Sequence, residues 1–423
     1  MTTTWQIDQL DNGLRLVTTP MPTAQSANVC IFVGVGSRME QRRLNGICHY
    51  LEHMLFKGTV NRPSALDIAQ AIEGAGGALN AFTNREYTGY WAHVPYDRLD
   101  LAVDVLTDMV RNALLDTAEI DRERTVIQQE IRRAHDLPAA WTGELLASAC
   151  YGDQPIGWPI AGSIESVEAM QRDDFRQHIA TWYVPQNIVL AVAGNTTPEQ
   201  VKALAGEKLS SLPPQSCPDF ERATDGLGEQ RFQTEARDTD QANLAIGLRA
   251  FSRTDPDRYV LAILNAVLGR GMSSRLFKEV RERRGLAYSV GSSVSRHHDT
   301  GVLAVSAGVA PQNVDETLKV VLDELFKLAN EPVPEDELTR ARDYTIGSFR
   351  LSLETTISLT QWTGENLIAT GEIEGIDEVV DIVRAVTADD IQRIARRLIR
   401  RDNIAMALVG PKADAAMLEK ALA

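Results

Sequence analysis

Apolar residues recur along this chain with two periods, one typical of helices and one typical of strands. Segments 103–109 and 318–325 place valine, leucine and methionine three or four residues apart, which predicts helices with one buried face. Segments 29–35 and 88–94 are short runs rich in β-branched and aromatic residues, which predicts strands. Strands that alternate with long helices indicate layers of helix and sheet, so we expect an α+β fold.

The same pattern of elements occurs twice. An aspartate-led helix runs into an apolar strand that stops at a glycine, first within residues 173–194 and again within residues 389–410. A second match pairs residues 94–108 with residues 309–323, each predicted as a strand, a short turn and a helix. Both matches have an offset of about 215 residues, which indicates an internal repeat.

Proline and small polar residues fill the stretch between the two copies, from Ser210 to Asp219. A chain of 423 residues is also too long for one ordinary core. We therefore predict two homologous domains of about 210 residues each. The predicted boundaries are a first α+β domain over 1–210, a linker over 211–228 and a second α+β domain over 229–423.

Composition narrows the classes of function. Apolar residues make up 44% of the chain and charged residues 24%, as in ordinary globular proteins. The net charge of −15 disfavours nucleic acid and anionic membranes as partners. The four cysteines have no paired spacing, no apolar run has membrane-spanning length, and the start of the chain leaves no room for a signal peptide. These features predict a cytoplasmic protein with reduced thiols.

The motif that carries chemistry is His49-Tyr50-Leu51-Glu52-His53, an H-x-x-E-H sequence. On a helix, positions four apart project from the same face, so His49 and His53 can bind one metal ion while Glu52 lies beside it. This is the inverse of the H-E-x-x-H motif, and it suggests a zinc-dependent hydrolase. The alternative is a helix with two surface histidines and a glutamate in an i,i+3 pair. Apolar residues around the motif argue against that alternative, because they predict a helix buried in a core.

A catalytic zinc usually takes three protein ligands, so two histidines leave the site incomplete. A helix is predicted to begin at Asp116 or Thr117, and it carries Glu123 and Glu130 two turns apart on one face. Spacing alone leaves two interpretations of Glu130 open. It is either the third ligand or one acid on a solvated helix face.

With Glu130 included, the sequence resembles the pitrilysin/insulinase family of zinc metallopeptidases. The segment from His49 to Thr59 is close to the family signature, and it is most similar to small bacterial members and to the catalytic subunit of mitochondrial processing peptidase. The resemblance covers nearly the whole chain. It implies one Zn²⁺ per chain held by His49, His53 and Glu130, with Glu123 supporting the site from outside the ligand set.

The resemblance also assigns residues outside the metal motif. Arg281 and Tyr288 match an arginine and a tyrosine that reach the bound peptide near the zinc, where such donors stabilise the charge on a carbonyl oxygen. Without the resemblance, the stretch around Arg281 reads as a basic helix that ends at Gly285. Asn80 and Ala81 match substrate-contacting positions of an edge strand that pairs with an extended peptide. Without the resemblance, Asn80 and Ala81 read as part of a glycine-rich turn before a strand.

These assignments imply a zinc endopeptidase that hydrolyses unfolded peptides or presequence-like segments. Glu52 is expected to act as the general base toward zinc-activated water and to return the proton to the leaving amine. The family pairs its homologous halves across a closed cavity, which admits unfolded peptides and excludes folded proteins. Members of this size usually form dimers, so we expect a homodimer or, alternatively, a heterodimer with a related subunit.

Two other functions fit parts of the sequence. Some family members are non-catalytic subunits of larger complexes, but these typically lack the zinc motif or the arginine–tyrosine pair, and this chain has both. A zinc hydrolase acting on a non-peptide substrate is the second alternative, and the predicted edge strand argues against it. Metal analysis together with a peptide-cleavage assay would separate the three functions.

Overall fold

The structure, a computed structural model, describes residues 4–423 and divides into two units, each assembled from separate stretches of the chain. Unit 1 consists of Met1–Ile131, Pro159–Glu221 and Leu351–Glu374, and unit 2 consists of Arg132–Trp158, Arg222–Arg350 and Gly375–Ala423. Each unit combines one sheet with helices, which confirms the expected α+β class. The division into a domain over 1–210, a linker over 211–228 and a domain over 229–423 was based on the repeat in the sequence, and it stays a prediction.

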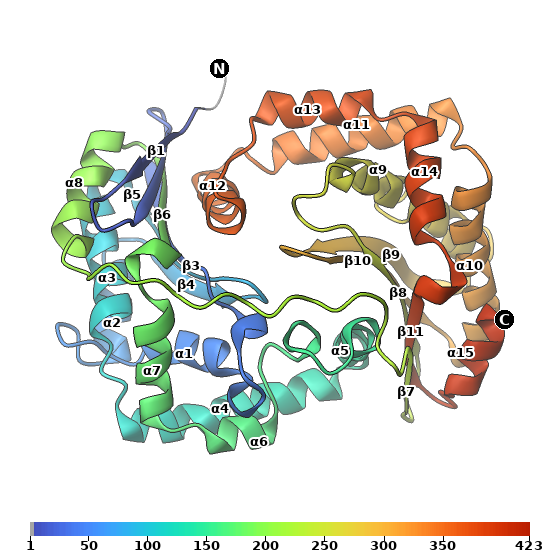
Figure 1. The fold of residues 1–423 in the computed structure, drawn as a ribbon, viewed down its shortest axis with the longest axis horizontal. Helices are drawn as coiled ribbons and strands as arrows, with labels where there is room; N and C mark the ends of the chain where they lie inside the picture. Colours follow the sequence, from blue (N-terminus) through green and yellow to red (C-terminus); the bar gives the residue numbers. More distant parts are fainter. Residues whose placement is uncertain (1–3) are drawn as a thin grey trace. The chain divides into compact units, whose positions relative to one another are not determined.

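Unit 1 is built on a six-stranded sheet in the order β1-β2-β6-β3-β5-β4 (Figure 1). All neighbouring strands are antiparallel except β2 and β6, which run parallel. The strands are β1 (Gln6–Gln9), β2 (Arg15–Pro20), β3 (Ser26–Val33), β4 (Ala78–Thr83), β5 (Thr88–Pro95) and β6 (Ile188–Gly194). The helices are α1 (Ile47–Leu55), α2 (Ala65–Glu73), α3 (Leu99–Asn112), α4 (Thr117–Asp136, which continues into unit 2), α6 (Ile164–Ala169), α7 (Arg172–Trp182), α8 (Pro198–Leu209) and α12 (Thr356–Thr370).

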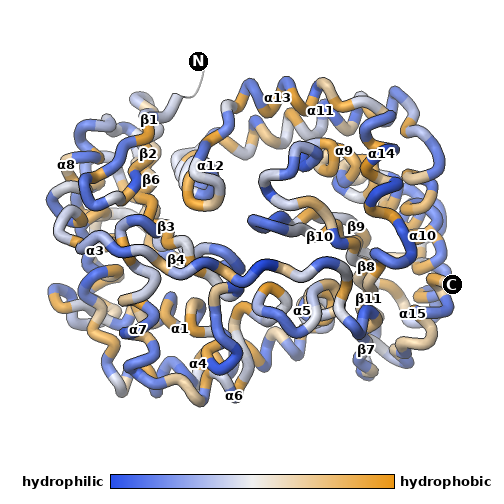
Figure 2. The backbone as a smooth tube through the Cα atoms, viewed as in Figure 1, coloured by the Kyte–Doolittle hydropathy of each residue, from blue (hydrophilic) through white to orange (hydrophobic). Residues whose placement is uncertain are grey.

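Both faces of this sheet are covered, which explains why its central strands β3 and β6 are mostly apolar. Along β3, Val29 and Ile31 belong to the core that includes α1 and α3. The alternating residues Cys30 and Phe32 point the other way and pack with Leu367 of α12. A strand buried on two faces favours apolar residues on both sides, and β6 is largely hydrophobic in Figure 2.

Unit 2 is built on a five-stranded sheet in the order β7-β11-β8-β10-β9. Its strands are β7 (Phe232–Ala236), β8 (Ala242–Ala250), β9 (Ala287–Arg296), β10 (Gly301–Val309) and β11 (Ile404–Gly410). Its helices are α5 (Pro138–Tyr151), α9 (Arg258–Leu268), α10 (Val314–Asn330), α11 (Glu335–Leu351), α13 (Ile376–Ala385), α14 (Ala388–Leu398) and α15 (Ala415–Leu422), together with a π-helical segment at Phe277–Glu282.

Apart from β1, which has no counterpart in unit 2, the two sheets have the same topology, which confirms the internal repeat. In unit 2 the pair β7 and β11 is parallel, and the following pairs along the sheet are antiparallel, as for β2 and β6 and their neighbours in unit 1. The predicted helix–strand matches correspond to α7 with β6 and to α14 with β11. Strands β4 and β9 occupy equivalent positions at the edges of their sheets.

Each sheet is covered on one face by a helix from the other half of the chain. Helix α12, late in the sequence, packs on β3 and β6 of unit 1, and the Thr360 hydroxyl donates to the Asn28 carbonyl at 3.2 Å. Helix α5, early in the sequence, packs on β8 and β11 of unit 2. There the strands present small residues such as Ala245 and Ala407 toward the helix, which lets the two backbones approach closely.

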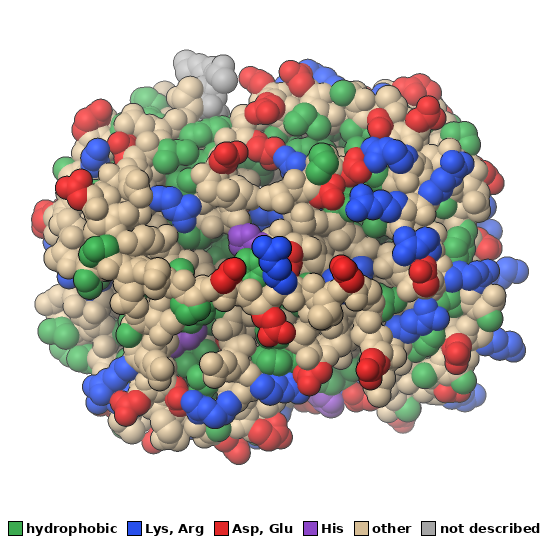
Figure 3. All heavy atoms as spheres, in the orientation of Figure 1, with side chains coloured by type: hydrophobic (Ala, Val, Ile, Leu, Met, Phe, Trp, Pro, Cys, Tyr) green, Lys and Arg blue, Asp and Glu red, His purple; other side chains and the backbone are tan. Residues whose placement is uncertain are grey.

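Charged side chains of both signs are interspersed over the face of the molecule drawn in Figure 3, as expected for an ordinary globular surface. The four cysteines are free thiols, as the spacing predicted. Within residues 4–423, none of the helices combines the length and the apolar character that a membrane span requires.

The packing of α12 on the sheet of unit 1 can be tested at Gly364. A Cβ atom at this position would come within 2.1 Å of Cε2 of Phe32, which is fully buried and has no space to move aside. Gly364→Ala is therefore expected to lower the free energy of unfolding by about 1–3 kcal/mol, the usual cost of overpacking. Thermal unfolding of the purified variant measures the change.

Gly143 of α5 provides the matched control, because nothing lies within 4 Å of a Cβ atom built there. Gly143→Ala should leave stability unchanged or raise it by up to about 1 kcal/mol, since alanine favours helices. Equal unfolding midpoints for the two variants would contradict the close approach of α12 to Phe32.

Candidate metal centre

The H-x-x-E-H motif lies on helix α1, as predicted. The helix begins after Gly46, whose φ of 98° places it in the left-handed region that favours glycine, and its last residue is Leu55. Gly58 follows shortly after the helix with a φ of 129°, in the region that favours glycine. Tyr50, Leu51, Met54 and other apolar residues fix the helix in the core of unit 1, while the polar side chains of the motif lie on its partly exposed side.

A buried carboxylate that the sequence analysis did not identify holds the beginning of α1. Glu40 accepts hydrogen bonds from the backbone amides of Gly46 at 2.7 Å and Cys48 at 2.9 Å, and from the Asn45 side chain at 2.9 Å. Burial raises the pKa of Glu40 to about 7, although these hydrogen bonds act in the opposite direction. The first turn of α1 is thereby attached to the preceding loop.

Helix α4 brings two glutamates to the exposed side of α1. Asp116 caps it by accepting from the amides of Ala118 and Glu119, which confirms the predicted start. The Tyr50 hydroxyl of α1 donates to the Ile120 carbonyl of α4, so the two helices are joined at their crossing. From this crossing, Glu123 and Glu130 extend toward α1 over two successive turns of α4.

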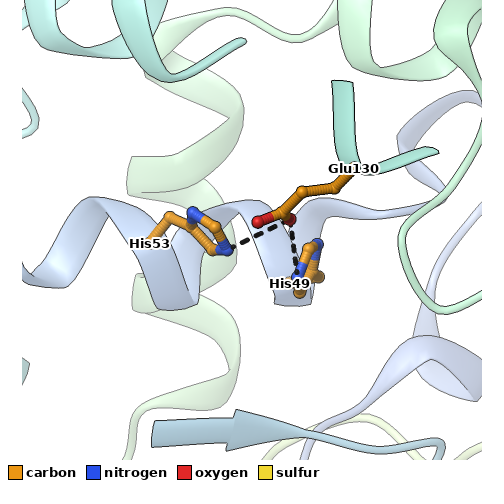
Figure 4. A group of neighbouring side chains, drawn as sticks. All are labelled: His49, His53 and Glu130. Carbon is orange, nitrogen blue, oxygen red and sulfur yellow. Dashed lines mark ion pairs between the residues drawn. The ribbon is translucent and has the colours of Figure 1, made fainter. Parts of the chain in front are cut away.

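His49, His53 and Glu130 form a group that can hold one metal ion, called the metal group below (Figure 4). Glu130 Oε2 lies 3.7 Å from Nε2 of His49 and 3.6 Å from Nε2 of His53. The three ligand atoms lie within 4.8 Å of one another. Among residues 4–423, this is the one such group of three or more histidine, cysteine or acidic side chains. The geometry supports Glu130 as a ligand rather than as an acid on a solvated face.

The donor set fits zinc. Ligand atoms around a tetrahedral zinc lie roughly 3.3 Å apart, and the two contacts of Glu130 are only slightly longer. Two imidazoles and one carboxylate are also a known catalytic zinc set, which leaves one position for water. Burial, followed by the charge of His53, lowers the pKa of His49 to about 4, so its imidazole is neutral near pH 7, as metal binding requires.

Glu123 contacts His53 without belonging to the group of His49, His53 and Glu130. Nδ1 of His53 lies 2.8 Å from Glu123 Oε1, which leaves Nε2 directed at Glu130. The second oxygen of Glu123 pairs with Lys57 Nζ at 2.5 Å. Burial raises the pKa of Glu123, but the bonds from His53 and Lys57 outweigh burial and lower it overall. His49 differs, because its Nδ1 is buried without a hydrogen-bond partner among the described residues.

Glu52 lies beside the metal group and is held by a residue that the sequence analysis did not identify. The Thr83 hydroxyl, at the end of β4, donates to Glu52 Oε2 at 2.6 Å. Burial raises the pKa of Glu52, while the Thr83 hydrogen bond and the charge of His53 lower it. A raised pKa suits a general base, because a carboxylate in its ordinary range is a weak base at neutral pH.

Asn80 and Ala81 lie on strand β4, which confirms that this glycine-flanked segment is a strand at the edge of a sheet. β4 pairs with β5 on one side and with no other strand of residues 4–423. Asn80 is exposed, and its Oδ1 accepts from the Ala81 amide at 2.8 Å. An edge of this kind can take up an extended chain by backbone pairing.

Arg281 and Tyr288 belong to unit 2 and lie close together there. Arg281 is in the π-helical segment, where a regular basic helix was expected, and its guanidinium carbon lies 5.0 Å from the Phe277 ring and 5.9 Å from the Tyr288 ring. The segment ends before Gly285, whose φ of 61° ends the helix as predicted. Tyr288, at the start of β9, is 77% exposed. Both side chains are therefore accessible within their own unit.

Cys48, although adjacent to His49, is not part of the metal group. Its thiol lies 3.6 Å from Nε2 of His178 on the buried side of α1. Burial lowers the pKa of His178 to about 4, so this pair is neutral. Cys48 therefore packs on the buried side of α1.

The chain matches two family descriptions. Residues 15–163 match "Insulinase (Peptidase family M16)", and residues 169–344 match "Peptidase M16 inactive domain". An uncharacterized zinc protease of Streptomyces coelicolor is 40% identical over 412 residues, which cover 96% of this chain and 89% of that protein. The uncharacterized zinc protease YmxG of Bacillus subtilis is 36% identical over 407 residues, covering 95% of this chain and 97% of that protein.

Solved structures share the fold at lower identity. A protease from Helicobacter pylori superposes with a TM-score of 0.91 at 22% identity, covering 97% of this chain and 100% of that chain. A chain of Complex III2 from Candida albicans gives a TM-score of 0.86 at 20% identity, covering 99% of each chain. The fold alone therefore does not distinguish a protease from a component of that complex. Sequence identity over nearly the full length does identify the family, and the chain belongs to the insulinase family, peptidase family M16.

Proposed function

We propose that this chain is a zinc-dependent endopeptidase that hydrolyses unfolded peptides or presequence-like segments. The observation that carries the proposal is the convergence of His49, His53 and Glu130 beside Glu52 on the outward side of α1. The names of the relatives, which describe them as zinc proteases, support the zinc-dependent peptidase activity. The rival function, a non-catalytic subunit, has no observation in its favour, because the metal group and its supporting residues are all present.

His49, His53 and Glu130 would hold one Zn²⁺, which supplies Lewis-acid polarisation of a peptide carbonyl and lowers the pKa of water. Glu52 takes a proton from the attacking water and delivers it to the leaving amine. Glu123 accepts from Nδ1–H of His53, which would leave the lone pair of Nε2 free to bind the metal on the side of Glu130. These roles follow from where each side chain is held.

The substrate class follows from the edge of β4. Backbone pairing along this strand recognises any extended peptide and rejects chains that are already folded. Asn80 and Ala81 would lie along such a peptide, and the Ala81 amide, now bonded to Asn80, is a donor that the peptide could use. We therefore assign both residues to substrate binding.

Arg281 and Tyr288 are assigned as donors to the carbonyl oxygen that gains charge in the transition state. The support is their match to the family and their exposure within unit 2. The expectations of a closed chamber, a homodimer or a heterodimer with a related subunit, and a cytoplasmic location likewise rest on the resemblance and on composition. The negative charge of the chain adds a mild preference for basic peptides.

The first test is cleavage of a mixture of unstructured peptides by the purified protein, with products mapped by mass spectrometry. The protein should cleave internal bonds, and a chelator should abolish cleavage until zinc is restored, because the site binds the metal reversibly. A folded protein added as substrate should remain intact. Cleavage that continues unchanged in chelator would contradict a zinc peptidase.

Glu130→Ala should remove most of the bound zinc, because it deletes one of the three ligands. Glu119→Ala on the same helix is its control, since Glu119 pairs with Arg122 and is not part of the metal group. Metal content measured by mass spectrometry should fall in the first variant only.

Glu52→Gln tests the base. Glutamine keeps the shape of the side chain but accepts no proton, so turnover should fall by about 100-fold or more while zinc content stays at the wild-type level. Glu73→Gln, at the exposed end of α2, should behave as wild type in both measurements. A Glu52→Gln enzyme that cleaves a quenched peptide at the wild-type rate would show that another group is the base.

Arg281→Ala tests the contribution of unit 2. It should lower kcat by about 10- to 100-fold, as expected when one charge-stabilising donor is lost, and leave zinc content unchanged. Arg275→Ala is the comparison, since Arg275 pairs with Glu337 at 2.7 Å and is assigned a structural role. Loss of zinc in Arg281→Ala would contradict the division of roles between metal binding and charge stabilisation.

A further inference from the structure

Thr83 connects the proposed base to the strand that is proposed to bind substrate. It is the last residue of β4, and its hydroxyl donates to Glu52 Oε2 at 2.6 Å, so this hydrogen bond joins strand β4 to helix α1. The contact is a charge-assisted hydrogen bond, which is stronger and more directional than one between neutral groups. The sequence resemblance assigned no role to this residue.

The threonine side chain is itself held in place. Thr83 pairs in register with Thr88 of β5, and the turn between the two strands is closed by Asn84, whose Oδ1 accepts from the amides of Glu86 and Tyr87. A β-branched side chain in a strand has few accessible rotamers. The position of the Thr83 hydroxyl is therefore fixed independently of Glu52, which makes this hydroxyl suitable for positioning the carboxylate.

Side chains along β4 alternate between the two faces of the sheet, and Thr83 lies on the face toward α1. Residues two apart in a strand share a face, so Ala81 and Thr83 project to the side of α1, where Ala81 packs with the core of that side. Phe82 projects to the opposite side and packs near Phe32. The contact to Glu52 thus follows from the register of the strand.

The hydrogen bond leaves the two oxygens of Glu52 unequal. Oε2 is occupied by the Thr83 hydroxyl, and Oε1 accepts no hydrogen bond from residues 4–423. A general base needs one oxygen free to accept a proton and a carboxylate plane that does not rotate during the step. The arrangement meets both requirements.

We propose that Thr83 is a positioning residue that fixes the Glu52 carboxylate through Oε2, so that Oε1 is the oxygen that accepts and returns the proton. The inference rests on the proposed role of Glu52 as the general base. Because Thr83 lies in the same strand as Asn80 and Ala81, binding of an extended peptide to β4 and orientation of the base are properties of one rigid segment.

The test replaces Thr83 with valine, which keeps the β-branched shape and removes the hydroxyl, and with serine, which keeps the hydroxyl. Thr83→Val should lower kcat by about tenfold with KM within about twofold of wild type, the pattern expected when an interaction made in the transition state is lost. Thr83→Ser should restore most of the activity. Zinc content should be unchanged in both variants.

Thr88→Val is the matched control. Thr88 is the register partner of Thr83 on the next strand, and its hydroxyl donates to the Val35 carbonyl at 2.9 Å rather than to Glu52. The control should lower the unfolding temperature and leave kcat unchanged. A readout independent of activity is a crystal structure of Thr83→Val, in which the Glu52 side chain should occupy a different rotamer or more than one.

The outcomes separate the two proposals. If Glu52→Gln is inactive but Thr83→Val keeps a wild-type kcat, or if Thr83→Ser is as slow as Thr83→Val, the role of Thr83 is wrong and the role of Glu52 stands. If Glu52→Gln remains active, the proposed base is wrong, and the role of Thr83 falls with it.

Discussion

The candidate site depends on the crossing of α1 and α4. One helix can place two imidazoles on the same face, but it cannot supply a third ligand on the opposite side of the metal. Here the second helix brings Glu130 next to both imidazoles, and the crossing is fixed by the hydrogen bond from the Tyr50 hydroxyl to the Ile120 carbonyl and by the contact of His53 with Glu123. The candidate ligands are thus placed by contacts between rigid elements, so little conformational entropy would be lost on metal binding.

Around this crossing, each functional side chain is held by a partner from a different part of the chain. Glu40 attaches the first turn of α1, Lys57 neutralises Glu123, and Thr83 holds Glu52. Partly buried carboxylates of this kind are costly unless each has a donor, and the donors at the same time determine orientation. His49 is the exception, since its buried Nδ1 has no partner within the described residues.

Helix α12, from the second half of the sequence, packs on the sheet of unit 1, and helix α5, from the first half, packs on the sheet of unit 2. The stability of each unit therefore depends on both halves of the sequence. Without α12, the face of the unit 1 sheet that carries Cys30 and Phe32 would be exposed to water, and so would the face of the unit 2 sheet beneath α5. Apolar sheet faces of this size are not stable in water. The repeat visible in the sequence is therefore a repeat of sheet topology, whereas each folded unit combines both halves of the chain.

Several features could be read from the sequence because they depend on short-range patterns. The H-x-x-E-H helix, the capped start of α4 and the repeat follow from local periodicity and capping, and the structure contains each of them. The edge strand with Asn80 and Ala81 was expected only from the family resemblance, because the residues alone read as a glycine-rich turn. The π-helical turn around Arg281 was expected as a regular helix, because a local sequence pattern does not distinguish i→i+5 from i→i+4 pairing.

The sequence by itself determined the helix that presents His49 and His53 and the acid face that carries Glu123 and Glu130, because hydrogen bonding and hydrophobic periodicity within one element fix both. Only the tertiary structure decided that Glu130 faces the histidines and that Lys57 and Thr83 hold the neighbouring carboxylates. It also decided that α12 covers the sheet of unit 1 and that α5 covers the sheet of unit 2. These depend on which surfaces pack together across long separations in the chain, and packing of that kind leaves no regular spacing in the sequence.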